Sequence, residues 1–213
     1  MGYLKTVKNS TSEFSNVRTD LFAVGVFEDL KLSNIGTEAD KYSGSQIKAA
    51  IENGDIKGKK GETSVFYGKK KRILVVGLGE KKKFNQEVMR LSGGTVLKTA
   101  ISKKLSTVGM EVFGNQKDAS YSQALAEGIV LGSYQFTKYQ TQDKELFEPK
   151  NAMIINGNAN AIEKGAIIGN SVCFARDMEN DPGNVTTPKK LASLAKEIAK
   201  EGGETSKVAK DRV

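Results

Sequence analysis

Continuous hydrophobic runs alternate along the chain with spaced hydrophobic stripes. The run LFAVGVF at residues 21–27 has no polar position, which is typical of a strand buried on both faces of a sheet. Four shorter runs also predict strands, at residues 62–67, 72–76, 107–113 and 152–155. The first two of these are separated only by Gly-Lys-Lys-Lys, so we expect them to form a hairpin.

Between these runs, apolar or small residues recur every three or four positions, which predicts helices over residues 37–55, 84–105, 120–139 and 161–180. Thr37 can cap the first helix, and Gly44 weakens its middle. Gly93-Gly94 in the second helix predicts either a kink or a close approach to the sheet. Two pairs of glycines four residues apart predict that the later helices pack closely: Gly128 with Gly132, and Gly165 with Gly169.

Strands that alternate with helices predict an α/β domain whose parallel or mixed sheet is covered on both faces. The stretch CFARDMENDPGNVTTPKKLA, residues 173–192, then holds two of the three prolines of the chain. The preceding helix should end near Asn180, a turn should follow, and Thr187 should cap a new helix with Pro188 in its first position. This stretch therefore predicts an interdomain hinge, formed by Asp181, Pro182, Gly183, Asn184, Thr187 and Pro188.

The composition narrows the class of protein. The chain has 213 residues, 38% hydrophobic content and a mean hydropathy of −0.40, which is typical of a globular protein. No run approaches the roughly 20 apolar residues of a membrane span, so we expect no membrane partner. The start of the chain lacks the apolar segment of a secretory signal, and a single cysteine excludes an internal disulfide. We therefore expect a cytoplasmic location.

The net charge of +8 is concentrated between Lys57 and Lys83, a segment that contains ten basic residues and only two acidic ones. Such a cluster can bind a polyanion such as nucleic acid. It can equally be a set of solvated turn residues that protect strand edges, and the scarcity of aromatic residues for base stacking favours this second interpretation. The candidate polyanion-binding residues are Lys59, Lys60, Lys69, Lys70, Lys71, Arg72, Lys81, Lys82 and Lys83.

Candidate catalytic chemistry is sparse. The chain has no histidine, which excludes the usual serine and cysteine triads and every imidazole–metal site. Cys173 lies among apolar neighbours and is predicted to be a packed core thiol, and the carboxylates are too scattered for a metal cage. Gly77-Leu78-Gly79 follows a strand, as a phosphate loop would. A third fingerprint glycine is missing because position 82 is lysine, so a tight glycine turn is the favoured interpretation.

Several of these segments resemble one family, the cytosol leucine aminopeptidases. FARDMENDPGNVTTPKKLA is similar to the family's link between its amino-terminal and catalytic domains. EGIVLGSYQFTKY is similar to the helix that precedes this link. GKKGETSVFYG and ILVVGLGEKKKF resemble the family's central hairpin and glycine-rich turn. The resemblance covers about residues 19–201.

The resemblance implies a three-layer α/β/α, macro-domain-like mixed sheet followed by a linker helix. Residues 1–175 would form the amino-terminal domain, and residues 176–213 the linker helix and the start of the catalytic domain. In the family, two divalent ions such as zinc or manganese, held by Asp, Glu and Lys of the catalytic domain, support removal of amino-terminal residues from peptides. None of those ligands occurs here, so no catalytic or metal residue and no cofactor of this chain is assigned.

The expected function is therefore that of a non-catalytic domain contributing to assembly and active-site access in a larger enzyme. Its partners would be the catalytic domain of the same polypeptide and, in a hexamer, further copies, with peptides as substrates of the parent enzyme. The tail GGETSKVAKDRV departs from the strand expected next, so we expect a fragment of that enzyme. Two binding modules remain as alternatives: the basic cluster with a polyanion, and a pocket near Gly77 and Gly79 with a nucleotide diphosphate.

Overall fold

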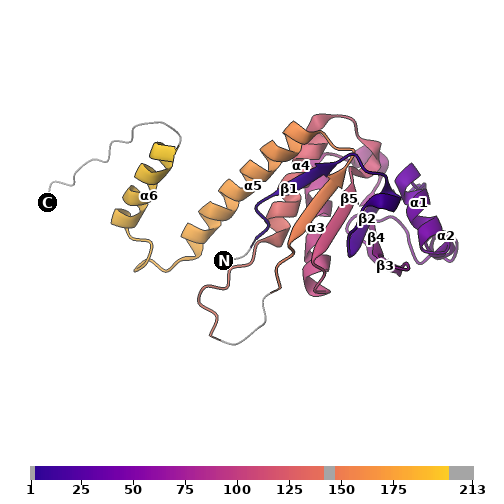
Figure 1. Cartoon of the computed structure of the whole chain (residues 1–213), viewed down its shortest axis with the longest axis horizontal. Helices are drawn as coiled ribbons and strands as arrows, with labels where there is room; N and C mark the ends of the chain where they lie inside the picture. The colour runs from indigo at the N-terminus through magenta and orange to yellow at the C-terminus, as the bar shows by residue number, and fades with distance from the viewer. Residues whose placement is uncertain (1–2, 142–146, 202–213) are drawn as a thin grey trace. The chain divides into compact units, whose positions relative to one another are not determined.

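A six-stranded mixed sheet organises the computed structural model, which describes residues 3–141 and 147–201 (Figure 1). Its strands are β1 (Val7–Ser10), β2 (Leu21–Phe27), β3 (Thr63–Tyr67), β4 (Arg72–Gly79), β5 (Thr107–Glu111) and β6 (Asn151–Ile155). They lie in the order β1-β6-β5-β2-β4-β3. All neighbours are parallel except β3 and β4, which form the predicted hairpin and pair Tyr67 with Arg72.

Within the part of the chain before residue 174, helices cover both faces of this sheet. The α-helices are α1 (Asn34–Tyr42), α2 (Gln46–Glu52), α3 (Gln86–Ser102), α4 (Ala119–Ser133), α5 (Ala159–Asn180) and α6 (Pro188–Glu201). Short 3₁₀ turns are η1 (Phe14–Asn16), η2 (Lys81–Lys83) and η3 (Phe113–Asn115).

The central strand β2 explains why both faces of the sheet are covered. All seven of its residues are buried. Side chains alternate between the two faces of a strand. Leu21 and Ala23 enter one core cluster, while Phe22 and Val24 enter the other. The continuous hydrophobic run therefore serves two cores at once, as the sequence predicts.

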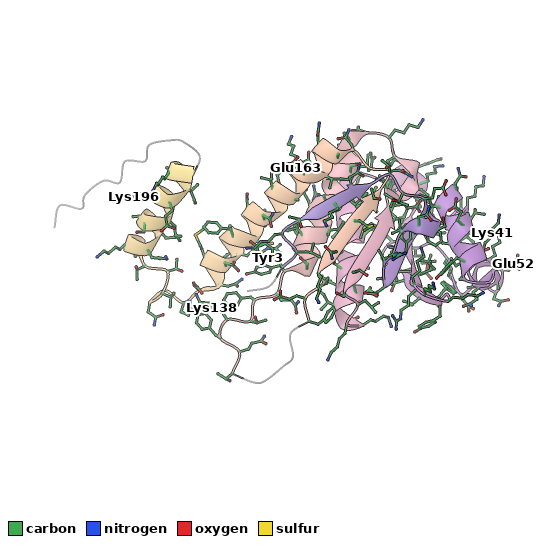
Figure 2. All side chains as sticks on the ribbon, in the orientation of Figure 1. Tyr3, Lys41, Glu52, Lys138, Glu163 and Lys196 are labelled. Carbon is green, nitrogen blue, oxygen red and sulfur yellow. The ribbon has the colours of Figure 1, made fainter. Side chains whose placement is uncertain are left out.

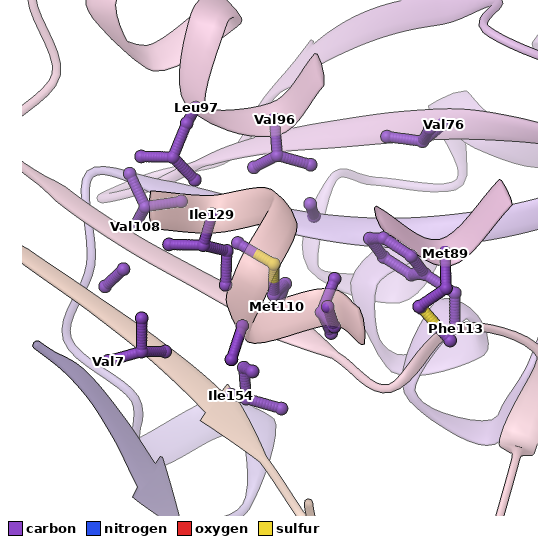
Figure 3. Packing of buried hydrophobic residues seen from close by; sticks show 14 of the residues in the cluster. Val7, Val76, Met89, Val96, Leu97, Val108, Met110, Phe113, Ile129 and Ile154 are labelled. Carbon is purple, nitrogen blue, oxygen red and sulfur yellow. The ribbon is translucent and has the colours of Figure 1, made fainter. Parts of the chain in front are cut away.

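The larger core lies between the sheet and helices α3, α4 and α5. Figure 3 shows Val96 and Leu97 of α3 and Ile129 of α4 beside the β5 side chains Val108 and Met110. The second core lies on the opposite face, where Ala39 of α1 and Ile47 of α2 pack with strand residues. In Figure 2, the charged side chains of Lys41 and Glu52 project outward from these two helices. Together the helices and sheet form the predicted three-layer α/β/α fold.

Glycines set the spacing of the two helices α3 and α4. A Cβ added to Gly128 would lie 2.0 Å from the carbonyl oxygen of Arg90, and one added to Gly132 would lie 2.5 Å from the Cα of Gly94. Only a residue without a side chain allows helix backbones to approach this closely. Gly93 likewise faces α4, so the predicted close approach of this helix is to another helix and not to the sheet.

Several predicted boundaries are wrong. The single helix predicted at 37–55 is two helices, because Gly44 and Ser45 both have left-handed backbone conformations, at φ 73° and 62°. Its first turn is capped by Ser33, whose Oγ accepts the Gly36 amide, and not by Thr37. The helix predicted at 120–139 ends at Ser133 because Tyr134 is extended.

The amino-terminal strand β1 is absent from the prediction. Its sequence, VKNS, has no hydrophobic pattern, and it is held as a strand by parallel pairing with β6. Strand β4 also extends three residues further than predicted, through Gly77-Leu78-Gly79.

The chain divides into two compact units, Met1–Cys173 and Phe174–Val213. In the second unit, α5 ends at Asn180, the predicted position. Residues 182–186 then turn, with the Val185 amide donating to the Pro182 carbonyl at 2.8 Å. The Thr187 Oγ1 accepts the Lys190 amide at 3.3 Å, so Thr187 caps α6 and Pro188 is its first residue, as predicted. That this turn acts as an interdomain hinge stays a prediction.

Candidate functional site

The predicted basic cluster is divided between the two ends of strand β4. Lys69 and Lys70 lie in the turn before this strand, while Lys81, Lys82 and Lys83 form η2 after it. Residues 58–61 bond to the same late part of β4, since the Gly79 amide donates to Gly58 and the Gly61 amide to Gly77, which places Lys59 and Lys60 at this end too. An eight-residue strand separates the groups by about 23 Å. Polyanion binding by the whole cluster stays a prediction.

Lys71 is the member of the cluster that the fold takes inside. Its side chain is only 6% exposed, and its Nζ donates to the carbonyl oxygens of Phe14 at 2.6 Å and Val17 at 3.0 Å. The ammonium also lies 3.9 Å from the centre of the Phe14 ring and 5.2 Å from that of Tyr42. Burial lowers the pKa of Lys71, because a charged ammonium loses hydration there. Through these hydrogen bonds, Lys71 connects η1 with the residues that precede β4.

Two other basic residues have local partners. Arg72 is half-buried, with its guanidinium carbon 5.9 Å from the centre of the Tyr67 ring. Lys83 forms an exposed ion pair with Glu80 one turn away. Lys83 is exposed, whereas Arg72 is partly covered.

Gly77 and Gly79 have no free amides to offer a phosphate. The Gly77 amide donates to the Glu62 carbonyl at 2.8 Å, and the Gly79 amide donates to Gly58 at the same distance. A Cβ on Gly77 would lie 2.0 Å from the Lys59 carbonyl oxygen, and Gly79 has φ 77°. These glycines therefore allow close backbone packing and a tight turn, which is the favoured interpretation of this motif.

The carboxyl ends of β2 and β5 hold a buried acid that the sequence analysis missed. Glu111 is 1% exposed, and its Oε1 accepts the Gly25 amide at 3.2 Å. The hydroxyl of Ser33 lies 2.8 Å from Oε2 and also accepts the Gly36 amide at the start of α1. No Lys or Arg of the described residues is within ion-pair distance. The signal was available, because Glu111 is a charged residue inside the predicted strand TVGMEVF.

Burial raises the pKa of Glu111 from 4.5 to about 7, and the hydrogen bonds from Ser33 and Gly25 oppose this rise. The carboxyl group is therefore largely protonated below neutral pH. A cavity of about 100 Å³ adjoins this region and is lined in part by Gly25, Ser33 and Lys81. That volume is well below the roughly 300 Å³ at which ligand pockets begin. Glu111 thus links β2, β5 and α1, and the cavity next to this region is too small for a substrate.

A larger groove lies at the opposite end of the strands, where the parallel strands β2, β4 and β5 begin. It has a volume of about 930 Å³ and is lined by residues 15–20 together with Tyr42, Lys70, Lys71 and Thr107. Asp20 joins the three strands at their amino ends. Its carbonyl accepts the Arg72 amide, and its Oδ2 accepts the Ser106 and Thr107 amides. The Thr107 Oγ1 accepts the Asp20 amide at 2.8 Å in return. Strand pairing therefore builds a rigid floor for this groove.

The remaining candidates concern metals, thiols and membranes. Cys173 is fully buried in the larger core, as predicted. Within residues 3–141 and 147–201, no group of three or more His, Cys, Asp or Glu side chains could hold a metal ion. In the same part of the chain, no helix combines the length and apolarity required to cross a membrane.

Known proteins similar to this chain share one description. A family model described as the N-terminal domain of the cytosol aminopeptidase family matches residues 23–143. A probable cytosol aminopeptidase of Alkaliphilus metalliredigens is 30% identical over 208 residues, which cover 90% of this chain and 42% of the relative. Another, of Aquifex aeolicus, is 32% identical over 179 residues, covering 79% of this chain and 35% of the relative. The chain thus spans less than half the length of these relatives.

Solved structures agree on the fold. A mutant tomato leucine aminopeptidase superposes with a TM-score of 0.77 at 24% identity, covering 93% of this chain and 42% of that one. The bottromycin maturation enzyme BotP, in a structure with Mn, gives a TM-score of 0.69 at 19% identity, covering 86% and 37%.

Proposed function

Since the chain belongs to the cytosol aminopeptidase family, through that family's N-terminal domain, we propose that it is the non-catalytic part of a metal-dependent aminopeptidase. The observation that carries the proposal is the family match over residues 23–143, within a fold shared with a leucine aminopeptidase. The catalytic part of the same polypeptide would then bind the metal ions and the peptide substrate.

The size of the relatives supports this division of labour. The matched segment is 42% of the Alkaliphilus metalliredigens relative, so more than half of that protein lies outside the similarity. Two metal ions, zinc or manganese, would stabilise an attacking water and the developing oxyanion in the catalytic part. BotP, a structural relative, has been solved with Mn.

Exposed apolar side chains support the proposal that another protein surface packs against this chain. Ile167 on α5 is 60% exposed, and on α6 Leu191 is 45% and Ile198 is 52% exposed. Leaving large aliphatic groups in water costs about 1.5–3 kcal/mol each relative to full burial. We propose that the catalytic part of the polypeptide, and other copies in a cytoplasmic hexamer, cover such residues. The domain would thereby contribute to assembly and to access to the active site.

A domain exchange tests this role. The matched segment of the Alkaliphilus metalliredigens relative would be replaced by the present chain, and the same relative would also be prepared without any such segment. We expect the exchanged protein to retain the mass of the assembled relative by light scattering and its hydrolysis of leucine p-nitroanilide. We expect the truncated protein to lose one or both. A truncated protein that assembles and hydrolyses like the intact relative would refute the proposed contribution.

A further inference from the structure

The groove at the amino ends of β2, β4 and β5 has no part in the proposed aminopeptidase role. Its volume of about 930 Å³ lies at the upper end of the range of small-molecule sites. It lies at the other end of the sheet from Glu111 and from the Gly77-Leu78-Gly79 segment. The side chains of this groove therefore require an explanation of their own.

The floor of the groove holds a buried cation without a counter-charge. Lys71 lines the groove and is only 6% exposed, and within the described residues no carboxylate lies within ion-pair distance of its Nζ. Two carbonyl oxygens and the Phe14 ring take up part of its charge. An ammonium has three N–H donors, so one remains beyond these two hydrogen bonds. Burying a charge is costly unless it is paired, and an anion in the groove would supply the pairing.

Two hydroxyl groups that line the floor of the groove are also free to donate a hydrogen bond. Thr19 is 8% exposed, and within the described part of the chain its buried Oγ1 has no hydrogen-bond partner. The Tyr42 hydroxyl accepts the amides of Lys70 at 2.9 Å and Lys71 at 3.2 Å, which leaves its proton to donate. A ligand rich in acceptor oxygens would satisfy both groups.

The rim of the groove is also positive. Arg18 and Lys70 line it and are exposed. The one carboxylate in the lining, Asp20, has its Oδ2 occupied by two backbone amides. Guanidinium groups bind phosphate oxygens in a bidentate manner, and lysine adds a point charge.

We propose that this groove binds the phosphate group of a small phosphorylated molecule. The phosphate would meet Lys71 and the hydroxyls at the floor, with Arg18 and Lys70 closing over its outer oxygens. The rest of the groove has room for an organic moiety of nucleotide size. This site is separate from the proposed aminopeptidase role, because none of its lining residues is among the exposed apolar residues assigned to assembly above.

Isothermal titration of the purified chain with inorganic phosphate, and separately with adenosine 5′-monophosphate, tests the proposal at constant ionic strength. We expect saturable binding at one site per chain. The double variant Arg18→Ala/Lys70→Ala should bind about tenfold more weakly or worse. The matched control Lys60→Ala/Lys82→Ala removes the same charge from exposed positions at the other end of β4 and should bind as the unmodified chain does.

The two ligands separate the sources of the phosphate group. Tighter binding of the monophosphate ester means that the groove also contacts the organic moiety, whereas equal affinities indicate a site for the phosphate group alone. Absence of saturable binding of both ligands at millimolar concentration would overturn the proposal. An equal loss of affinity in the two double variants would overturn it as well, since that result would reflect net charge and not this groove. Thermal melts check that all four exposed substitutions leave the fold intact.

Discussion

At the scale of single residues, Glu111 and Lys71 are buried with no opposite charge within ion-pair distance among the described residues. The fold treats them differently. Lys71 keeps a partly compensated charge through two carbonyl oxygens and aromatic rings. Glu111 has a backbone amide and a hydroxyl beside it, and its pKa rises to about 7. We therefore expect the ionisation of Glu111 to change stability near neutral pH.

We expect Glu111 to make the domain less stable as the pH rises. Its folded pKa of about 7 lies above the ordinary 4.5, so the folded state binds the proton more tightly than the unfolded state. The stabilisation is fully present below pH 4.5 and is lost progressively as the pH rises to about 7. The total loss is on the order of 3 kcal/mol. Urea unfolding across this range measures it.

The variant Glu111→Gln supplies the control, because its amide has a similar shape and cannot ionise. Its free energy of unfolding should lack this dependence and should exceed that of the unmodified protein at mildly alkaline pH. Parallel curves for the two proteins over the whole range would show that Glu111 does not titrate as described.

Whether the burial of a single residue can be predicted depends on how that residue compares with its neighbours in the sequence. Cys173 was placed correctly in the core because its helical neighbours are apolar. Glu111 was visible as a charge inside a hydrophobic strand and could have been found. Lys71 could not, because a lysine in a Gly-Lys-Lys-Lys turn has the same local pattern as its solvated neighbours. Its ammonium is buried because η1 lies beside the turn, and Phe14 of η1 is 57 residues away in the chain.

At the scale of elements, the packing of α3 against α4 depends on glycines facing each other. The Arg90 carbonyl occupies the space where a Cβ of Gly128 would be, at 2.0 Å. The same pair of helices is joined by Arg90, whose guanidinium contacts the nearly buried Glu127 at 2.7 Å. Two helices held this closely should tolerate an added methyl group only where the opposing surface leaves room.

We therefore expect Gly128→Ala and Gly94→Ala to differ in sign. The first places a methyl group against backbone atoms that cannot move independently, and should destabilise the fold by about 1–3 kcal/mol or more. The second meets its nearest atom at 3.5 Å, an ordinary contact, and alanine favours the helix by up to about 1 kcal/mol. Thermal unfolding of both variants measures the difference. Equal destabilisation by the two would contradict the close approach described here.

Elements were predictable where hydrophobic periodicity was strong. Strand β2, the β3–β4 hairpin, and the beginning of α6 at Thr187-Pro188 all followed from local pattern and capping chemistry. Strand β1 did not, because pairing with β6 and not its own sequence makes it a strand. The break between α1 and α2 was signalled by Gly44, but its size depended on Ser45 also adopting a left-handed conformation.

At the scale of the whole molecule, the alternation of strands and helices predicted a layered α/β fold. The order of strands in the sheet could not be deduced from it, since β1, β6 and β5 are neighbours although 140 residues separate β1 from β6. The two ends of the parallel strands differ in the chemistry of their side chains. A buried acid with a raised pKa and a small cavity lie at the carboxyl ends of the parallel strands, and a positive groove lies at their amino ends.

We propose that peptide hydrolysis belongs to polypeptide outside these 213 residues. The most direct test of this proposal is hydrolysis of leucine p-nitroanilide by the purified chain with saturating Mn²⁺ or Zn²⁺, compared with the same sample plus a chelator. We expect no release of p-nitroaniline above the rate without protein in either case. Metal-dependent release that the chelator abolishes and that co-purifies with the chain would contradict it.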